Sequence, residues 1–360
     1  MLSAGNGFIM QSEKYSRDNA GQSLKKYILL KKGELAYNHG ASKAKQYGCC
    51  YELTEDEARI PYVYHCFKVS GAEHTPYVAT ALNNPKIDRQ LKRLVSSSVR
   101  MDGLLNISFD DYMSVILHLP SLKEQTHIAD FLKKLDERIT AQEKLVASLK
   151  KYKRGLLRKV FAKLSDSCEK RNLKEVSVLF ADGDWIESKD QALDGIRLIQ
   201  TGNVGFGVYI DKTQNAKYIS ETTFHRLNCL EIYDGDILIS RLPEPAGRAC
   251  LLPKSTERRI TAVDCTVIRT DSSVIDRNYL LQFLCSEQYL KTVNSFLAGG
   301  TRQRISRKNL EGIEVPYPSI DEQRYWGSFL CKVDARISNE EQRRSSLSRL
   351  RCFMLQQLFI

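Results

Sequence analysis

The chain has 360 residues and a mass of 41.1 kDa; 42% of its residues are hydrophobic, 27% are charged, and its net charge is +11. This length suits two or three domains, and the composition is typical of globular proteins, which excludes a disordered chain. No apolar run reaches the roughly 18 to 20 residues of a membrane-spanning helix, and residues 1–10 lack the basic start of a secretory signal. We therefore expect a cytoplasmic protein.

Two parts of the chain combine short β-rich runs with few helices, which predicts a mixed α/β (α+β) domain in each. Between residues 24 and 118, strands are predicted at 34–37 and 63–69, and a helix near 85–95. Between residues 172 and 318, Gly, Pro and Asp turns separate several β-rich runs. There the predicted strands are 196–200, 208–210, 236–240, 248–252 and 261–270, with one helix near 279–296.

A segment of about 40 residues without internal proline follows each of these parts and predicts a long helix. Ser121 with Glu124, and Ser319 with Glu322, have the spacing of a capping box. Apolar residues then recur at steps of three and four, as in a coiled-coil seam, so we predict that the helices pack together antiparallel. The predicted seam consists of Ile128, Phe131, Leu132, Leu135, Ile139, Val146, Leu149, Tyr152, Leu156 and Val160 in the first helix, and of Phe329, Leu330, Val333, Ile337, Leu347, Leu350, Met354 and Leu358 in the second.

The basic excess is concentrated in the first long helix. Seven basic residues and no acidic residue lie between Lys150 and Lys163. Such a run is either a solvated helix face or a surface close to a polyanion such as DNA. The run by itself does not distinguish the two.

The chain contains an internal repeat. Residues 119–161 align without gaps with residues 317–359, at an offset of 198, and 15 of the 43 positions are identical. A globular domain followed by a long helix therefore occurs twice. We predict domains at 1–118 and 164–317, a central long helix at 119–163 and a C-terminal long helix at 318–360.

The first domain is predicted to be incomplete at its N-terminus. Aligning Gly5-Asn6 with Gly202-Asn203 leaves residues 172–197 without a counterpart before Met1. A truncated gene, a start placed too late and a separate completing chain are all consistent with this alignment, and a truncated or split gene is the interpretation we favour.

Motifs of catalysis are missing from the sequence. It contains neither a phosphate-binding G-x-x-x-x-G-K-[ST] loop nor a complete dinucleotide fingerprint. Its ten cysteines and six histidines show no C-x-x-C or H-E-x-x-H spacing, so we predict reduced, mostly buried thiols and no metal site. Asp182, Asp184, Glu187 and Lys189 form a compressed acidic run that suits a surface turn better than a nuclease metal site.

The repeated segments resemble the specificity subunit of type I restriction-modification systems. The resemblance rests on P-S-L-K-E-Q at 120–125 and P-S-I-D-E-Q at 318–323, each followed by F-L and D-x-R-I. G-D-I-L-I-S-R at 235–241 and Q-R-I-S-R-K-N-L at 303–310 also resemble that family. The resemblance covers nearly the whole chain, and the duplicated helix is its most specific part.

This resemblance implies a non-catalytic protein with two target recognition domains, each of which reads one half of a split DNA site. The long helices would hold the two domains apart and dock methyltransferase (modification) subunits and a restriction subunit with translocase and nuclease activity. No cofactor is expected in this chain. S-adenosylmethionine, ATP and Mg²⁺ are expected in the partner subunits, and the target bases and spacer length stay open.

Candidate DNA contacts are basic and amide side chains in loops. In the second domain they are Arg302, Gln303, Arg304, Arg307 and Lys308, together with Arg241 and Arg248 of a proline-containing loop; Lys254, Arg258 and Arg259 are weaker candidates. In the first domain they are Asn38, His39, Ser42, Lys43, Lys45 and Gln46. Each could instead be a solvated surface residue. Two other functions stay open: a coiled-coil scaffold that does not bind DNA, and an enzyme that methylates or cuts DNA alone.

Overall fold

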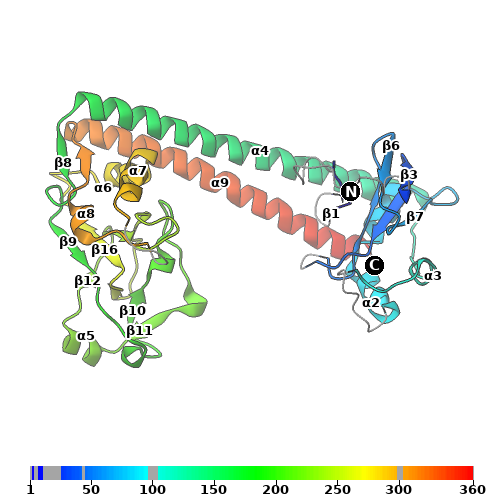
Figure 1. Cartoon of the computed structure of the whole chain (residues 1–360), viewed down its shortest axis with the longest axis horizontal. Coiled ribbons are helices and arrows are strands. Elements are labelled where there is room, and N and C mark those ends of the chain that lie inside the picture. The colour runs from blue at the N-terminus through cyan, green and yellow to red at the C-terminus, as the bar shows by residue number, and fades with distance from the viewer. Residues whose placement is uncertain are drawn as a thin grey trace. The chain divides into compact units, whose positions relative to one another are not determined.

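The computed structural model describes residues 2–3, 7–10, 26–42, 45–95, 104–297 and 303–359. The chain divides into two compact units, and both include parts of the two long helices (Figure 1). Unit 1 is Met1–Glu143 with Gln342–Ile360, and unit 2 is Lys144–Glu341. The predicted division into four segments stays a prediction.

Unit 2 contains two four-stranded sheets. The first has the order β11-β10-β15-β12, in which only β10 and β15 are parallel, and the second has the antiparallel order β14-β13-β16-β9. A two-stranded sheet pairs β17 with β8. The strands are β8 Lys170–Asn172, β9 Leu179–Asp182, β10 Ile196–Ile199, β11 Lys217–Ile219, β12 Glu231–Ile232, β13 Ile237–Ser240, β14 Ala249–Leu251, β15 Arg259–Thr261, β16 Cys265–Arg269 and β17 Glu314–Pro316.

The two four-stranded sheets of unit 2 pack face to face, and helices cover the second sheet. Ile199 and Ile232 of the first sheet share a buried cluster with Leu238 and Val267 of the second. Ile237, Ile239 and Ile268 point to the opposite face of the second sheet and join a larger core with the helices. The helices are α5 Glu221–Leu227, α6 Arg277–Leu284, α7 Glu287–Ser295 and α8 Arg307–Glu311.

Several details of unit 2 differ from the sequence predictions. Residues 208–210 form no strand, and Tyr209 makes only an isolated bridge to Val204. Strands β8, β9, β11, β12 and β17 were not predicted, and the strand predicted at 261–270 is the end of β15 followed by β16. The helix predicted near 279–296 is two helices, because the Ser286 side chain accepts a hydrogen bond from the Tyr289 backbone and starts α7.

Unit 1 repeats part of this arrangement. Its described strands are β1 Leu2–Ser3 paired with β2 Gly7–Phe8, β3 Ile28–Lys31 paired with β6 Glu57–Ile60, and the sheet β5 Cys49–Glu52, β4 Leu35–Asn38, β7 His65–Phe67. The helices α1 Thr75–Ala81, α2 Pro85–Leu94 and α3 Phe109–Met113 follow, as α6, α7 and α8 follow in unit 2. In unit 2, β16 lies between β13 and β9; among the described residues of unit 1, β7 pairs with β4 alone.

Both predicted long helices are present, as α4 Leu122–Ser167 and α9 Ile320–Leu358. Ser121 and Glu124 bond reciprocally at the start of α4, as the capping spacing predicts. In unit 1 the guanidinium of Arg351 forms two hydrogen bonds with the carboxylate of Asp136, and Ala129 packs near Phe359. Residues early in α4 thus meet residues late in α9, so the helices are antiparallel there.

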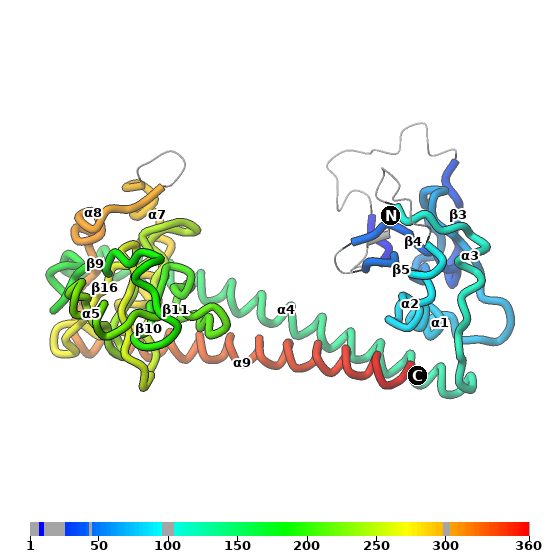
Figure 2. Tube along the Cα trace, turned by 90° about the horizontal axis from the view of Figure 1, so that it is seen from below, coloured from blue at the N-terminus to red at the C-terminus, as the bar shows by residue number. Residues whose placement is uncertain are grey.

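The same antiparallel packing occurs in unit 2, where α4 and α9 lie side by side (Figure 2). Lys150 pairs with Glu341 at 2.6 Å and Lys153 with Asp334 at 2.5 Å. Leu157 and Val160 share a core with Leu330, which is fully buried. The prediction of two long antiparallel helices in a mixed α/β protein is confirmed. No described helix is long and apolar enough to cross a membrane.

The seam prediction is wrong at three positions, because Phe131, Tyr152 and Leu350 are exposed. Leu132, Leu135, Leu330 and Ile337 are buried, and Ile128, Ile139, Leu149, Phe329, Val333 and Leu347 are half-buried. Phe131 and Leu350 are each 43% exposed, and Tyr152 is 56% exposed. At Phe131 the reason is geometric: successive helical residues point about 100° apart, so with Leu132 on the buried side Phe131 points outward.

Candidate nucleic-acid interface

An exposed polar cluster lies at the start of α8. Buried Ile305 donates its backbone N–H to the carbonyl of Arg241, and the Ser306 side chain caps α8, which together hold the backbone here. Gln303, Arg304, Arg307 and Lys308 are exposed around this anchor. Arg304 pairs with Asp264 at 3.2 Å, and Arg307 with Glu311 at 3.3 Å. Arg302 lies outside the described residues.

Arg241 is buried beneath this cluster, in contrast to its predicted role as a DNA contact. Its guanidinium donates to the Val263 carbonyl at 2.6 Å and pairs with Asp182 at 3.2 Å. Burial lowers the pKa of Arg241, and the nearby cations Arg304 and Arg307 lower it further. Arg241 therefore joins strand ends inside the domain, since its side chain is only 5% exposed.

Arg248 also has an internal role that its sequence position did not reveal. Its guanidinium donates to four backbone carbonyls, those of Thr201, Val204, Leu242 and Pro245, at 2.7 to 3.1 Å. These bonds join the two ends of the proline-containing loop to the turn at 201–204. Arg248 therefore holds the proline-containing loop in place and is not itself a candidate DNA contact.

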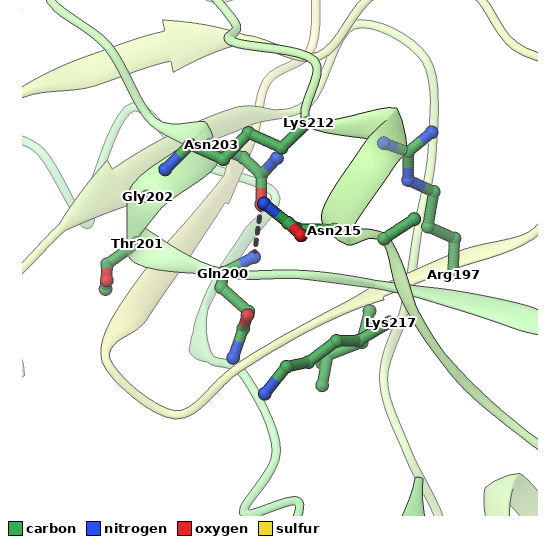
Figure 3. Close-up of a pocket in the computed structure, with 10 residues that line it drawn as sticks. Arg197, Gln200, Thr201, Gly202, Asn203, Lys212, Asn215 and Lys217 are labelled. Carbon is green, nitrogen blue, oxygen red and sulfur yellow. Dashed lines mark hydrogen bonds between the residues drawn. The ribbon is translucent and has the colours of Figure 1, made fainter. Parts of the chain in front are cut away.

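A polar hollow of about 170 Å³ lies beside that turn and was missed by the sequence analysis (Figure 3). Its lining comes from two segments, 197–203 and 212–217. Lys212, Asn215 and Lys217 are exposed on one segment, and Gln200 and Asn203 lie on the other. Asn203 is structural, because its Oδ1 accepts from the Gln200 backbone at 3.0 Å and its Nδ2 donates to the Ile210 carbonyl at 2.9 Å. Amide and lysine side chains are suited to nucleic-acid contacts.

Two of the weaker candidates form ion pairs with acidic side chains of unit 2; Arg258 is 43% exposed and Arg259 is buried. Arg258 forms hydrogen bonds with both carboxylate oxygens of Glu231, at 2.9 and 2.8 Å, and also with Glu221. Arg259 is 3% exposed and bonds to Asp234 and to the Pro253 carbonyl. Lys254 is exposed. Both arginines therefore neutralise acidic neighbours in the described structure.

The residues of the compressed acidic run at 182–189 each make a different local contact. Asp184 accepts from the Leu230 backbone at 2.9 Å, and burial raises the pKa of its carboxyl group. Glu187 pairs with Lys189 at 2.8 Å, while Asp182 faces Arg241. In the part of the chain that the structure describes, no three His, Cys, Asp or Glu side chains converge as metal ligands would.

The candidates of unit 1 are largely engaged in its own structure. His39 is 5% exposed, and its ring nitrogens face the carbonyl oxygens of Leu105 at 3.0 Å and Val63 at 2.7 Å. Asn38 accepts from the Gly40 backbone, and Lys45 donates to the Asn83 carbonyl at 3.1 Å. Ser42 and Gln46 are exposed and Lys43 lies outside the described residues. His39 is thus a structural residue in this fold.

The cysteines are free, as the sequence predicts. Burial raises the pKa of the Cys50, Cys250 and Cys285 thiols to about 12. These three thiols therefore stay protonated at neutral pH and behave as small apolar side chains.

The comparisons with known proteins agree with this architecture. Residues 165–349, more than half of the chain, match the family described as "Type I restriction modification DNA specificity domain". The chain therefore belongs to this family, as a type I specificity subunit.

Individual relatives are distant. The chain is 23% identical over 273 residues to the type I restriction enzyme MjaVIII specificity subunit of Methanocaldococcus jannaschii; the match covers 71% of this chain and 64% of that relative, which is less than two thirds of its length. Two solved structures share the fold at 18% identity. One is titled as the basis of complex assembly and conformational transition of the type I R-M system, with a TM-score of 0.56 over 92% of this chain and 82% of that one. The other is the type I restriction-modification system S subunit from M. genitalium, with a TM-score of 0.53 over 92% and 83%.

Proposed function

We propose that this protein is the DNA-recognition subunit of a type I restriction-modification complex and that it reads a split site. The observation that carries the proposal is the duplicated α/β domain with its long helix, in a chain that belongs to the DNA specificity family. Two copies of a reading domain suit two half-sites. The subunit itself carries out no catalysis in this proposal.

The exposed side chains at the start of α8 are the proposed phosphate and base contacts of unit 2. Gln303, Arg304, Arg307 and Lys308 present one amide and three cations, and Lys212 and Lys217 of the polar hollow extend the basic surface. Phosphate contacts supply most of the affinity in such complexes, and contacts to base edges supply the specificity. Arg241 and Arg248 act in this proposal by holding the loops in place.

The partners are proposed to be modification subunits that bind S-adenosylmethionine and a restriction subunit that uses ATP and Mg²⁺. The exposed apolar side chains on the long helices are the proposed docking points. In unit 2, Tyr325 is 62% exposed and lies at 5.1 Å from Trp326, ring centre to ring centre. In unit 1, Phe131 is exposed on α4. Exposed apolar side chains grouped on a soluble protein commonly mark protein contacts.

Binding to duplex DNA, measured by fluorescence anisotropy with the modification subunits present, tests the proposal. Arg304→Ala and Lys308→Ala should each weaken binding several-fold and reduce the slope of log affinity against log salt by about 1, because each loses one phosphate contact. Lys174→Ala is the matched control, since Lys174 is exposed and its ammonium lies 6.0 Å from the Phe180 ring centre.

The outcomes separate the alternatives. Unchanged affinity and salt slope in both variants would remove the start of α8 from the interface. A wild-type complex that binds no duplex, even at low salt, would favour the coiled-coil scaffold. Methylation or cleavage of DNA by the purified chain alone would establish an enzyme.

A further inference from the structure

A buried glutamine occupies the first turn of each long helix at matching positions of the repeat. Gln125 and Gln323 are both 1% exposed. Gln125 donates from Nε2 to the Pro120 carbonyl at 2.9 Å, and its Oε1 accepts from the His74 backbone at 3.0 Å. Its Nε2 also donates to the carboxylate of Glu73. The amide therefore uses both its donor and its acceptor.

Gln323 makes the corresponding two bonds in unit 2. Its Nε2 donates to the Pro318 carbonyl at 2.9 Å, and its Oε1 accepts from the Asp276 backbone at 3.0 Å. Asp276 is the N-terminal cap of α6, as His74 is of α1. In both units one side chain thus connects the entry to a long helix with the start of a short helix of the globular domain.

The short helix approaches the long helix closely one turn further on. A Cβ atom added to Gly327 would lie 2.5 Å from Asp276 Oδ1 and 2.7 Å from the Tyr279 nitrogen, so only glycine fits there. The matching residue in unit 1 is Ala129, which is 8% exposed and packs with Tyr77 and Ala81 of α1. A small residue follows each glutamine after four positions.

The other long helix contacts the same short helix. Tyr77 of α1 stacks on Phe359 with ring centres 5.0 Å apart, and Tyr279 of α6 packs on Phe161 at 5.5 Å. Phe161 and Phe359 occupy matching positions near the ends of α4 and α9. Each short helix therefore packs against the start of one long helix and the end of the other.

We propose that a domain clamp in each unit fixes the orientation of the globular domain on the long helices and so sets the half-site spacing that the protein accepts. The domain clamp consists of Gln125, Ala129, Tyr77 and Phe359 in unit 1, and of Gln323, Gly327, Tyr279 and Phe161 in unit 2. The inference rests on the proposed function. The glutamines are positioning residues that do not touch DNA.

The glutamines fix the orientation because the two hydrogen bonds of a side-chain amide are directional. Apolar contact is non-directional, so the tyrosine–phenylalanine pair alone would allow the short helix to slide or turn on the long ones. A buried amide that leaves one of its groups unpaired is destabilised, because that group has lost its hydrogen bonds to water without gaining one to the protein. The bond to the Pro318 carbonyl holds the Gln323 amide at the start of its own helix. The bond from the Asp276 backbone can then form only in one relative placement of α6 and α9, which makes the joint stiff.

Distances within unit 2 test the clamp without DNA. Spin labels on genetically encoded amino acids at exposed Leu193 and exposed Lys332 report the position of the domain relative to α9. The distance distribution should broaden in Gln323→Leu, which lacks both bonds. It should stay narrow in Gln342→Leu, the same substitution at an exposed position of α9. Gln323→Asn keeps the amide but shortens its reach, so it serves as the milder variant if the leucine variant does not fold.

Spacing selectivity tests the functional role. Duplexes whose half-sites are one base pair closer or further apart should bind wild-type complex about tenfold more weakly, because two linked sites bind together only when the geometry fits. Gln125→Leu and Gln323→Leu should reduce that discrimination to below about threefold, while affinity for a duplex with one half-site stays as in wild type. A variant that had merely lost its folded structure would show a lower affinity for the duplex with one half-site as well as a lower spacing discrimination.

The two experiments separate the clamp from the proposed function. An unchanged distance distribution in Gln323→Leu and Gln323→Asn would overturn the clamp. A broadened distribution with full spacing discrimination would overturn its role in positioning. If wild type binds no duplex, the proposed function and the spacing role fall together, and the distances alone decide whether the clamp holds the domain.

Discussion

At the residue scale, the arginines of unit 2 divide into those that hold the fold and those that face solvent. Arg248 donates to four backbone carbonyls, and Arg241 and Arg259 are both buried. A guanidinium has five donors in one plane, so it can satisfy several carbonyls that a loop leaves unpaired. Arg304 and Arg307 have exposed side chains, which makes them available to phosphate.

Arg248→Ala should destabilise unit 2 by about 3 kcal/mol, because it leaves several carbonyls without their charged donor. Arg248→Lys should recover only part of this loss, since an ammonium cannot reproduce the planar fork. Urea unfolding midpoints measure the effect. Arg324→Ala is the control, because Arg324 is exposed and pairs with exposed Asp321 at 3.5 Å. Equal losses in the two alanine variants would contradict the prediction.

Stability of unit 1 should depend on pH through His65. Burial lowers the pKa of His65 from its ordinary value of 6.5, and nearby His39, 4.9 Å away between ring centres, lowers it further. The native state then binds the proton less readily than the unfolded state, so stability falls as the pH drops below 6.5. At pH values well above 6.5, the contribution of neutral His65 to the stability of unit 1 is fully present.

Melting temperatures at pH 7.5 and 5.5 measure this dependence. Wild type should lose more stability on acidification than His65→Gln, which keeps a donor for the Ile107 carbonyl that His65 faces at 3.2 Å. His118→Gln changes an exposed residue and should behave as wild type. The same acid sensitivity in all three proteins would rule out His65 as the source.

At the element scale, the long helices show how far periodicity predicts packing. Steps of three and four select the buried side correctly at Leu132, Leu135 and Ile337. Where two apolar residues are adjacent, as at Phe131 and Leu132, only one can point to the partner helix. Glu340 is an exception to the rule that the buried side of α9 is apolar, since it is 1% exposed and pairs with Arg336 at 2.8 Å.

Adjacent substitutions in α4 test this assignment. Leu132→Ala should cost about 2 to 4 kcal/mol, because it empties a buried site that is 4% exposed. Phe131→Ala should cost less than about 1 kcal/mol, because much of its ring already contacts water. Thermal unfolding of the two variants gives the comparison, and a larger loss for Phe131→Ala would show that the seam is turned the other way.

At the scale of the whole molecule, each long helix belongs to both units. The boundary between the units falls at Glu143 in α4 and at Glu341 in α9. Each unit therefore combines one globular part with the start of one long helix and the end of the other. In the proposed function, the length of these shared helices becomes the distance between the two DNA-reading domains.

Inserting four residues next to Ala141 should change the spacer that the complex accepts, because four residues add about one helical turn, or roughly 6 Å. Sequencing of methylated sites, with the modification subunits present, identifies the accepted spacer. A four-residue insertion in the exposed loop at Lys254 is the control and should leave the spacer unchanged. If the Ala141 insertion variant methylates the wild-type site, the helices do not set the spacing.

The sequence by itself determined the elements whose signals are local or repeated. The capping residues Ser121 and Glu124 marked the start of α4, and the gapless repeat showed that a domain and a long helix occur twice. Helical periodicity also predicted most of the buried seam. These features depend on neighbours within a few residues or on direct comparison of two stretches of chain, so no knowledge of distant contacts was needed.

Only the tertiary structure decided which side chains are left free to act. Arg241, Arg248 and His39 looked like DNA contacts in sequence, but carbonyls and carboxylates from distant segments surround them. The roles of Gln125 and Gln323 were hidden for the same reason, since their partners His74 and Asp276 lie 51 and 47 residues away. Whether a polar group is satisfied internally depends on which strands and helices meet, and that is settled by packing of the whole unit.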